Sequence, residues 1–307
     1  MKSNLLFFLL LVLAPLASCF SQKKPNTSNS FSQQIAKGEP VIAEQKEYKD
    51  VVSFIDIQQS ISENENVYRQ SIQSAIVFKK CNFRKGFLAS LNNNNNNYFL
   101  TFTQPVLFDS CYFWEDTDFR GCDFGSSVNF RNCMFYGKAN FEETEWTSNV
   151  WFLNCFFKKE VRFQNSFFNR KVNFFQCVYD DLCSFQSCFF NQDAQFSSVK
   201  FWKYTDFSLC TFNAGVFYNY AQFFEHTLFN NSLFRDRAEF INATFKKNME
   251  MKSCKFFGEV KFNKTELNDV WDLGDAIFYM GKPDLPQPMN AVVKTQNVKY
   301  LKLESLQ

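Results

Sequence analysis

The chain has 307 residues, among them 43 Phe but only nine Gly and seven Pro. Its 33 basic and 31 acidic residues give a net charge of +2. This balance argues against a basic surface for nucleic acid, and it argues equally against an acidic surface that imitates DNA.

Residues 1–18 are expected to be a signal peptide. Lys2 supplies a positive charge, and the apolar run from Leu5 to Leu13 is shorter than the roughly 20 residues that cross a bilayer. The stretch Leu16-Ala17-Ser18-Cys19 resembles a bacterial lipobox, which would place a lipid on Cys19. The alternative is an ordinary signal peptide and a secreted protein. We therefore expect export and anchoring to a membrane of the bacterial cell envelope.

Two segments are expected between the signal and the main repeat. Residues 19–50 are rich in Ser, Gln, Asn, Lys and Pro, which favours a flexible tether. Residues 51–101 are expected to form an N-terminal cap with one partial coil at Ile76–Phe83. Within them, the run Asn92–Asn97 predicts a solvated loop.

From residue 102 to residue 267, a large apolar residue returns at alternating intervals of five and six. Thirty consecutive positions from Phe108 to Leu267 obey the pattern, and 25 of them are Phe. On an α-helix, five residues advance about 500°, so successive rings would point to different sides. A small residue stands two positions before each ring, as Val128 does before Phe130. Residues two apart share one side of a strand, so the pattern predicts short strands joined by tight corners.

The segment Val128-Asn129-Phe130-Arg131-Asn132-Cys133-Met134-Phe135 resembles the pentapeptide-repeat family, in a Phe-centred variant with one added residue in every second unit. The resemblance covers residues 102–267. It implies an all-β fold, a right-handed quadrilateral β-helix with four units per coil. The added residues predict 22 residues per coil instead of 20. Residues 268–307 are expected to be a C-terminal cap or tail, and the resemblance allows a homodimer through this end.

Nine cysteines occupy the small inward positions of the repeat: Cys111, Cys122, Cys133, Cys155, Cys177, Cys183, Cys188, Cys210 and Cys254. Val, Ala, Thr and Ser fill these positions elsewhere, which favours reduced core cysteines. Stacked pairs are nevertheless near enough for disulfides. The only histidine, His226, falls at a variable corner. We expect no catalytic, cofactor or metal site, and hence no enzyme.

Residues spaced by 22 should share one wall of the coil. One wall then collects apolar side chains, namely Tyr112, Trp114, Met134, Tyr136, Phe156, Trp202 and Phe224. The opposing faces are polar, with Asp118, Asn140, Arg162, Ser184 and Asp206 in one row. An exposed apolar wall usually contacts a partner. The alternatives are that these side chains only support the sheet, or that the N-terminal segment or residues 84–99 cover them.

These features favour a non-enzymatic, membrane-anchored β-helical protein with a structural or protein-interaction role. Its protein partner is unknown, its membrane contact would be the N-terminal lipid, and no nucleic acid is expected. The alternative that the family resemblance offers is a topoisomerase-binding DNA mimic. That function would need residence in the cytoplasm and an acidic face.

Overall fold

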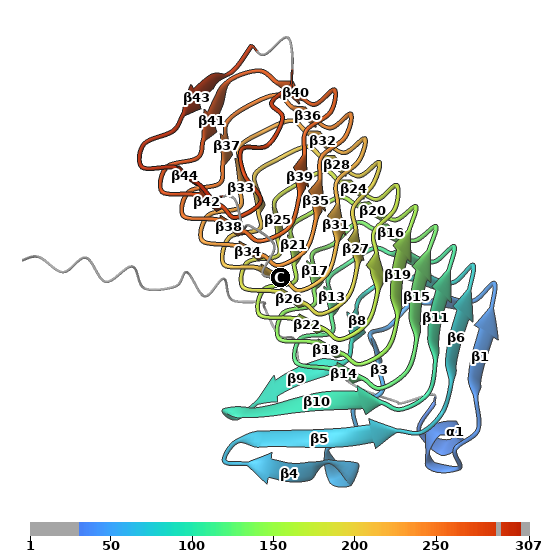
Figure 1. Ribbon diagram of the computed structural model, residues 1–307. Helices are drawn as coiled ribbons and strands as arrows, with labels where there is room; N and C mark the ends of the chain where they lie inside the picture. Colours follow the sequence, from blue (N-terminus) through green and yellow to red (C-terminus); the bar gives the residue numbers. More distant parts are fainter. Residues whose placement is uncertain (1–30, 287–289, 302–307) are drawn as a thin grey trace, which may run out of the picture.

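The computed structural model describes residues 31–286 and 290–301. Within them the chain winds as a solenoid with four walls, each a β-sheet (Figure 1). We call these walls sheets A to D, in the order in which each coil visits them. Among the described residues, a short helix, α1 (Ser32–Ala36), precedes the first coil, and a 3-10 turn, η1, spans Ile57–Gln59.

The strands of sheets A and B are as follows, in their order along the rod. Sheet A contains β1 (Val41–Glu44), β6 (Ile76–Lys79), β11 (Val106–Asp109), β15 (Val128–Arg131), β19 (Val150–Leu153), β23 (Val172–Asn173), β27 (Ala194–Gln195), β31 (Val216–Phe217), β35 (Ala238–Glu239) and β39 (Val260–Lys261). Sheet B contains β2 (Glu47–Tyr48), β7 (Asn82–Phe83), β12 (Tyr112–Phe113), β16 (Met134–Phe135), β20 (Phe156–Phe157), β24 (Val178–Tyr179), β28 (Lys200–Phe201), β32 (Gln222–Phe223), β36 (Thr244–Phe245) and β40 (Glu266–Leu267).

The other two walls are longer. Sheet C contains β3 (Val52–Ser53), β8 (Phe87–Leu88), β13 (Thr117–Asp118), β17 (Ala139–Asn140), β21 (Val161–Arg162), β25 (Cys183–Ser184), β29 (Thr205–Asp206), β33 (Thr227–Leu228), β37 (Met249–Glu250), β41 (Val270–Asp272) and β43 (Val292–Lys294). Sheet D contains β4 (Ile61–Asn64), β5 (Val67–Ile72), β10 (Asn96–Phe102), β14 (Asp123–Phe124), β18 (Glu145–Trp146), β22 (Phe167–Phe168), β26 (Phe189–Phe190), β30 (Thr211–Phe212), β34 (Leu233–Phe234), β38 (Lys255–Phe256), β42 (Ile277–Phe278) and β44 (Lys299–Tyr300), and β9 (Ser90–Asn93) pairs with β10.

The strand register follows the 22-residue period of the sequence. Val128 pairs with Val150, and Val150 pairs with Val172, so equivalent residues of successive coils lie directly beside one another. The predicted all-β, four-sided β-helix is therefore confirmed.

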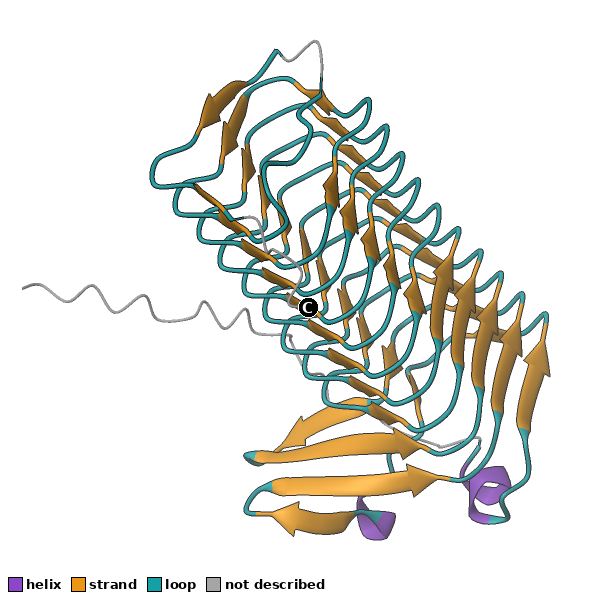
Figure 2. Cartoon of the chain, viewed as in Figure 1, coloured by secondary structure: helices purple, strands orange, loops and turns teal. Residues whose placement is uncertain are grey.

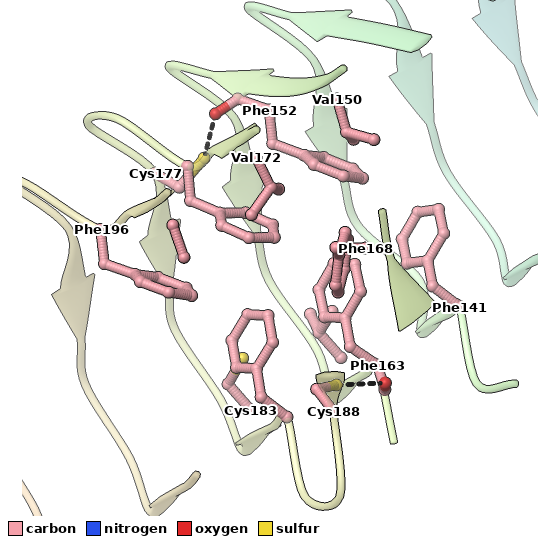
Figure 3. Close-up of a cluster of buried hydrophobic side chains, with 14 of the residues drawn as sticks. Phe141, Val150, Phe152, Phe163, Phe168, Val172, Cys177, Cys183, Cys188 and Phe196 are labelled. Carbon is pink, nitrogen blue, oxygen red and sulfur yellow. Dashed lines mark hydrogen bonds between the residues drawn. The ribbon is translucent and has the colours of Figure 1, made fainter. Parts of the chain in front are cut away.

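The core consists of aromatic rings stacked along the rod. The ring of Phe130 lies 5.0 Å from that of Phe108 and 4.9 Å from that of Phe152, with interplanar angles of 3° and 7°. Figure 3 shows how rings from neighbouring walls fill the space between the sheets. Each buried Phe contributes on the order of 2 kcal/mol, so burial of these rings dominates the stability of the solenoid.

Cysteine suits the small inward positions because of its size and because its thiol can donate a hydrogen bond to the backbone. The thiols of Cys177 and Cys188 donate hydrogen bonds to the carbonyl oxygens of Phe152 (3.1 Å) and Phe163 (2.9 Å) in the preceding coil (Figure 3). Elsewhere a hydroxyl does the same, as Ser232 does toward Phe207 at 2.7 Å. All ten cysteines of the described residues are free and buried, in agreement with the prediction of reduced core cysteines.

The tight corners recur with a left-handed residue. From Ser110 to Asp275, every eleventh residue has a positive φ. At one such corner the backbone N–H of Cys122 donates to the carbonyl of Phe119 at 3.1 Å, which closes a four-residue turn around Gly121. Successive core rings are five residues apart where the chain leaves sheet A or sheet C. They are six residues apart where it leaves sheet B or sheet D.

The N-terminal region differs from the expected boundaries. The predicted tether, 19–50, includes β1 and β2 of the first coil and helix α1. Phe31 and Ile35 are buried, and the ring of Phe31 lies 5.5 Å from Phe54 and 5.8 Å from Phe78. Apolar residues at 31, 35 and 41 thus place this segment on the open end of the core, and residues 31–50 are not a tether.

Two hairpins interrupt the first coils on sheet D. Strands β4–β5 and β9–β10 extend this sheet sideways into a four-stranded blade (Figure 2). The Asn-rich run predicted as a solvated loop is part of the second hairpin, with Asn94 (φ 52) and Asn95 (φ 65) at its turn. Asn tolerates positive φ at both central positions of a two-residue hairpin turn.

The solenoid also continues past its predicted end at residue 267. Leu273 and Phe278 occupy the next core positions, and strands β43 and β44 extend sheets C and D to Tyr300. Trp271 takes a position that is small in most other coils, and it packs against Phe262 at 4.8 Å. Residues 270–278 and 292–300 therefore continue the solenoid, and the C-terminal homodimer stays a prediction. No helix in the described ranges is long and apolar enough to cross a membrane.

Candidate partner-binding wall

Sheet B carries all seven residues that the sequence assigns to one apolar wall. In one row the outward side chains of Tyr112, Met134 and Phe156 lie in register. A second row runs along the corner that follows the core position, and it contains Trp114, Tyr136, Trp202 and Phe224. We call these seven residues the aromatic wall.

Within the second row the rings stack face to face. Trp114 lies 4.5 Å from Tyr136 with an interplanar angle of 9°, and Trp202 lies 4.0 Å from Phe224 with an angle of 7°. The two tryptophans keep 39% and 41% of their surface exposed. Because strands are about 4.8 Å apart, rings of successive coils stack and are held in one orientation before any partner arrives.

An ion pair divides the aromatic wall into two patches. Lys158 and Asp180 occupy the two coils between Tyr136 and Trp202, and their side chains contact each other. Upstream of this pair lie Tyr112, Trp114, Met134, Tyr136 and Phe156. The downstream patch is the Trp202–Phe224 pair.

Arg84 joins the upstream patch. Its guanidinium lies 4.9 Å from the centre of the Trp114 ring and forms an ion pair with Glu47 at 3.0 Å. Sequence reasoning missed this residue because hairpin β9–β10 breaks the 22-residue spacing between its coil and the next. The available sequence signal was the likeness of Cys81-Asn82-Phe83 to Cys111-Tyr112-Phe113, which the structure pairs in register.

From the sequence, the N-terminal segment or residues 84–99 could cover the aromatic wall. Apart from Arg84, the segment 84–99 contributes to sheets C and D, and its hairpin extends sheet D. Residues 41–48 form strands of the first coil and stack on the end of the rod. Of the first segment, Arg84 lies over the Trp114 ring, and Trp114 and Trp202 nevertheless keep 39% and 41% of their surface exposed.

Sheet C is the polar wall that the sequence predicts, and it adjoins sheet B rather than facing it. The predicted row from Asp118 to Asp206 is in register. Many of its charges are matched, since Arg162 lies 2.6 Å from Glu160 and 3.7 Å from Glu142. The wall carries both signs of charge.

His226, the residue that any histidine-dependent chemistry would need, also belongs to the polar surface. Its Nε2 lies 3.0 Å from Glu250 Oε1, and Lys252 Nζ lies 2.8 Å from the same carboxylate. Burial alone would raise the pKa of Glu250, but hydrogen bonds from Lys252 and Asn230 outweigh it. The pKa of Glu250 is therefore lowered. Glu250 is thus held as a carboxylate within an ion-pair network.

The outward aromatic residues on sheets A and D were not identified from the sequence. Phe167 and Phe189 stack at 4.5 Å on sheet D, and Trp151 and Phe217 project from sheet A. The same spacing of 22 relates the first two, so the sequence did contain the signal. Sheet D has a second stacked pair, Phe257 and Tyr279, at 4.2 Å, so the apolar surface is distributed over three walls.

The repeat matches a known family model. The model described as pentapeptide repeats, in nine copies, matches residues 101–145 and 130–178. No curated protein and no solved structure matches the chain. The same register continues on both sides of the matched residues. Residues 101–178 therefore carry pentapeptide repeats, and the solenoid that continues them in register is a pentapeptide-repeat β-helix.

Proposed function

We propose that this β-helix is a non-enzymatic binding protein, anchored to the bacterial cell envelope by a lipid on Cys19, which holds a protein partner on its aromatic wall. One observation carries the binding role. The ring pairs Trp114–Tyr136 and Trp202–Phe224 are stacked outside the core, and the tryptophans stay exposed.

The composition of the wall fits the centre of a protein interface. Trp, Tyr and Arg are the residue types that most often contribute large shares of binding energy. Stacking holds Trp114 and Tyr136 in place, so little side-chain entropy is lost when a partner docks. Arg84 and the Lys158–Asp180 pair supply charges at the edge and in the middle of the wall, which would fix the orientation of the partner.

The alternative, a DNA mimic that binds a topoisomerase, receives no support from the charge distribution. Such a surface requires rows of unpaired carboxylates. On sheet C, by contrast, Glu142 and Glu160 lie beside Arg162, and Glu250 and Asp272 lie beside Lys252.

The partner surface is tested by crosslinking and pull-down from the cell envelope. The double variant Trp114→Glu, Tyr136→Glu should lose a partner that the native chain captures, because two carboxylates would replace the stacked rings. The matched control is Gln164→Glu, Gln186→Glu on sheet C, which adds the same charge and should keep the partner. Equal capture by both double variants would contradict the proposal.

The anchor is tested separately by mass spectrometry of the mature N-terminus. Cys19 lies outside the described residues, and the support for a lipid there is the lipobox-like sequence. We expect a chain that begins at Cys19 and carries the added mass of a diacylglyceryl group. A Cys19→Ala variant should leave the membrane fraction. A mature chain without lipid would refute the anchor and leave the aromatic wall untouched.

A further inference from the structure

Sheet A contains a surface pocket that is separate from the aromatic wall on sheet B. Its volume is about 320 Å³, within the roughly 300–1,000 Å³ of small-molecule sites. The strand register places four outward residues in one row, in the order Trp151, Asn173, Gln195 and Phe217. At about 4.8 Å per coil, the two aromatic ends of this row are about 14 Å apart.

The Phe217 end of the pocket is fixed by its neighbours. Gly215 leaves the space that the ring occupies, because a Cβ at this position would lie 2.7 Å from Phe217 Cζ. From the following coil, the guanidinium of Arg237 covers the ring at 5.1 Å from its centre. One face of Phe217 is therefore occupied, and the pocket receives the other.

The floor of the pocket is made of amides. Asn173 Oδ1 accepts the backbone N–H of Phe175 at 2.8 Å, which orients this amide and leaves its NH₂ group as a donor. Gln195 Oε1 is buried and has no hydrogen-bond partner in the described part of the chain. A buried acceptor without a partner destabilises the folded chain. A ligand that donates a hydrogen bond there would remove this penalty.

The charged groups at the rim balance each other. Lys171 Nζ lies 3.5 Å from Asp193 Oδ2, and both residues line the pocket. An anionic ligand would have to compete with Asp193 for the lysine, and a purely apolar ligand would leave the floor amides unpaired. The pocket suits a neutral molecule with apolar faces and a rim of hydroxyls.

We propose that this pocket binds a neutral oligosaccharide. A pyranose ring carries C–H groups on its faces and hydroxyl groups around its edge. The C–H faces would pack against Trp151 and Phe217, and the hydroxyls would bond to Asn173 and Gln195. This site is on a different wall from the proposed protein surface and does not depend on it.

The test uses the purified full-length protein with two neutral trisaccharides, cellotriose and the trimer of N-acetylglucosamine. We expect saturation transfer in NMR from the protein to at least one of them, and a single site by calorimetry. Trp151→Ala should weaken that binding at least tenfold. Trp202→Ala, on sheet B, is the matched control and should leave the dissociation constant unchanged.

Gln195→Leu separates ligand binding from folding. It removes the unpaired acceptor, so the variant should unfold at a higher denaturant concentration and yet bind the sugar at least tenfold more weakly. The anionic sialyllactose should bind more weakly than the neutral sugars. The proposal fails if neither neutral trisaccharide binds, if binding survives both Trp151→Ala and Gln195→Leu, or if sialyllactose binds as tightly.

Discussion

Strand β20 contains two adjacent phenylalanines whose side chains point to opposite sides of the sheet. Phe157 is fully buried, and its ring lies 4.6 Å from Phe135 and 4.9 Å from Tyr179 in the adjacent coils. Phe156 points outward and lies in register with Met134 and Val178. The inner row keeps an aromatic ring from Tyr48 to Phe245, whereas the residue type in the outer row differs from one coil to the next.

This difference shows which side of the strand the repeat constrains. Each inner ring must fill a space whose height is the coil spacing and whose neighbours are other rings, so few residue types fit. An outer side chain has neighbours only along its row. The repeated backbone therefore sets the interior, and both binding proposals rest on outward residues, Trp114 and Trp151 among them.

The largest expected effect tests this contrast directly. Phe157→Ala should reduce the free energy of unfolding by about 3–5 kcal/mol, because it leaves a cavity in a packed core. Phe156→Ala removes the same atoms from the adjacent residue and should cost about 1 kcal/mol or less. Chemical denaturation followed by circular dichroism measures both. Similar losses would show that Phe156 is as tightly packed as the core.

The hairpin-bearing coils can be compared with the regular ones at a single corner. Gly121 has φ 64, and a Cβ there would lie 2.7 Å from the ring of Phe99, which is held between Arg69 and Arg120. Asn tolerates this φ, so Gly121→Asn isolates the steric clash and should cost about 1–3 kcal/mol.

The control for this corner is the equivalent position three coils further along. Ser187 has φ 60, and Ser187→Asn should leave the denaturation midpoint nearly unchanged. In a chain that already carries Phe99→Ala, Gly121→Asn should not lower the denaturation midpoint further, because the ring that it would meet is absent. If Gly121→Asn alone is neutral, the blade does not constrain this corner.

The sequence predicted the regular coils because their core residues are nearly uniform. It failed at residues 41–72 because the first coil places Ala43, Tyr48 and Ile72 beside the Phe78, Phe83 and Phe102 of the second. Phe31 of the N-terminal segment packs against Phe78 there. An end coil packs against a cap instead of another coil, so it loses the pattern that would identify it.

The candidate surfaces could be predicted only as rows. The spacing of 22 assigns Trp114, Tyr136 and Trp202 to one wall. It does not reveal that Arg84 lies over Trp114, because an inserted hairpin intervenes. It also cannot reveal the pocket on sheet A, which depends on the Phe217 ring folding over Gly215.

A smaller effect is expected inside the core, where one ring carries a polar atom. Tyr179 stacks between Phe157 and Phe201 at 4.9 and 5.0 Å, and its buried hydroxyl has no hydrogen-bond partner among the described residues. Burial raises the pKa of Tyr179 well above its usual value. Tyr179→Phe should stabilise the protein by about 1 kcal/mol or more. Tyr136→Phe on the aromatic wall is the matched control and should change little.

The smallest effect concerns a corner, where the inner and outer sides of the chain meet. Leu209 adopts φ 61 with 52% of its surface exposed, whereas Asn231 holds the same corner in the next coil. The left-handed conformation costs a residue such as leucine about 1 kcal/mol, and asparagine tolerates it better. Leu209→Asn should therefore raise the free energy of unfolding by about 0.5–1 kcal/mol. Leu153→Asn, on a strand of sheet A, removes similar apolar surface without a positive φ. An equal gain there would assign the effect to solvation instead of backbone strain.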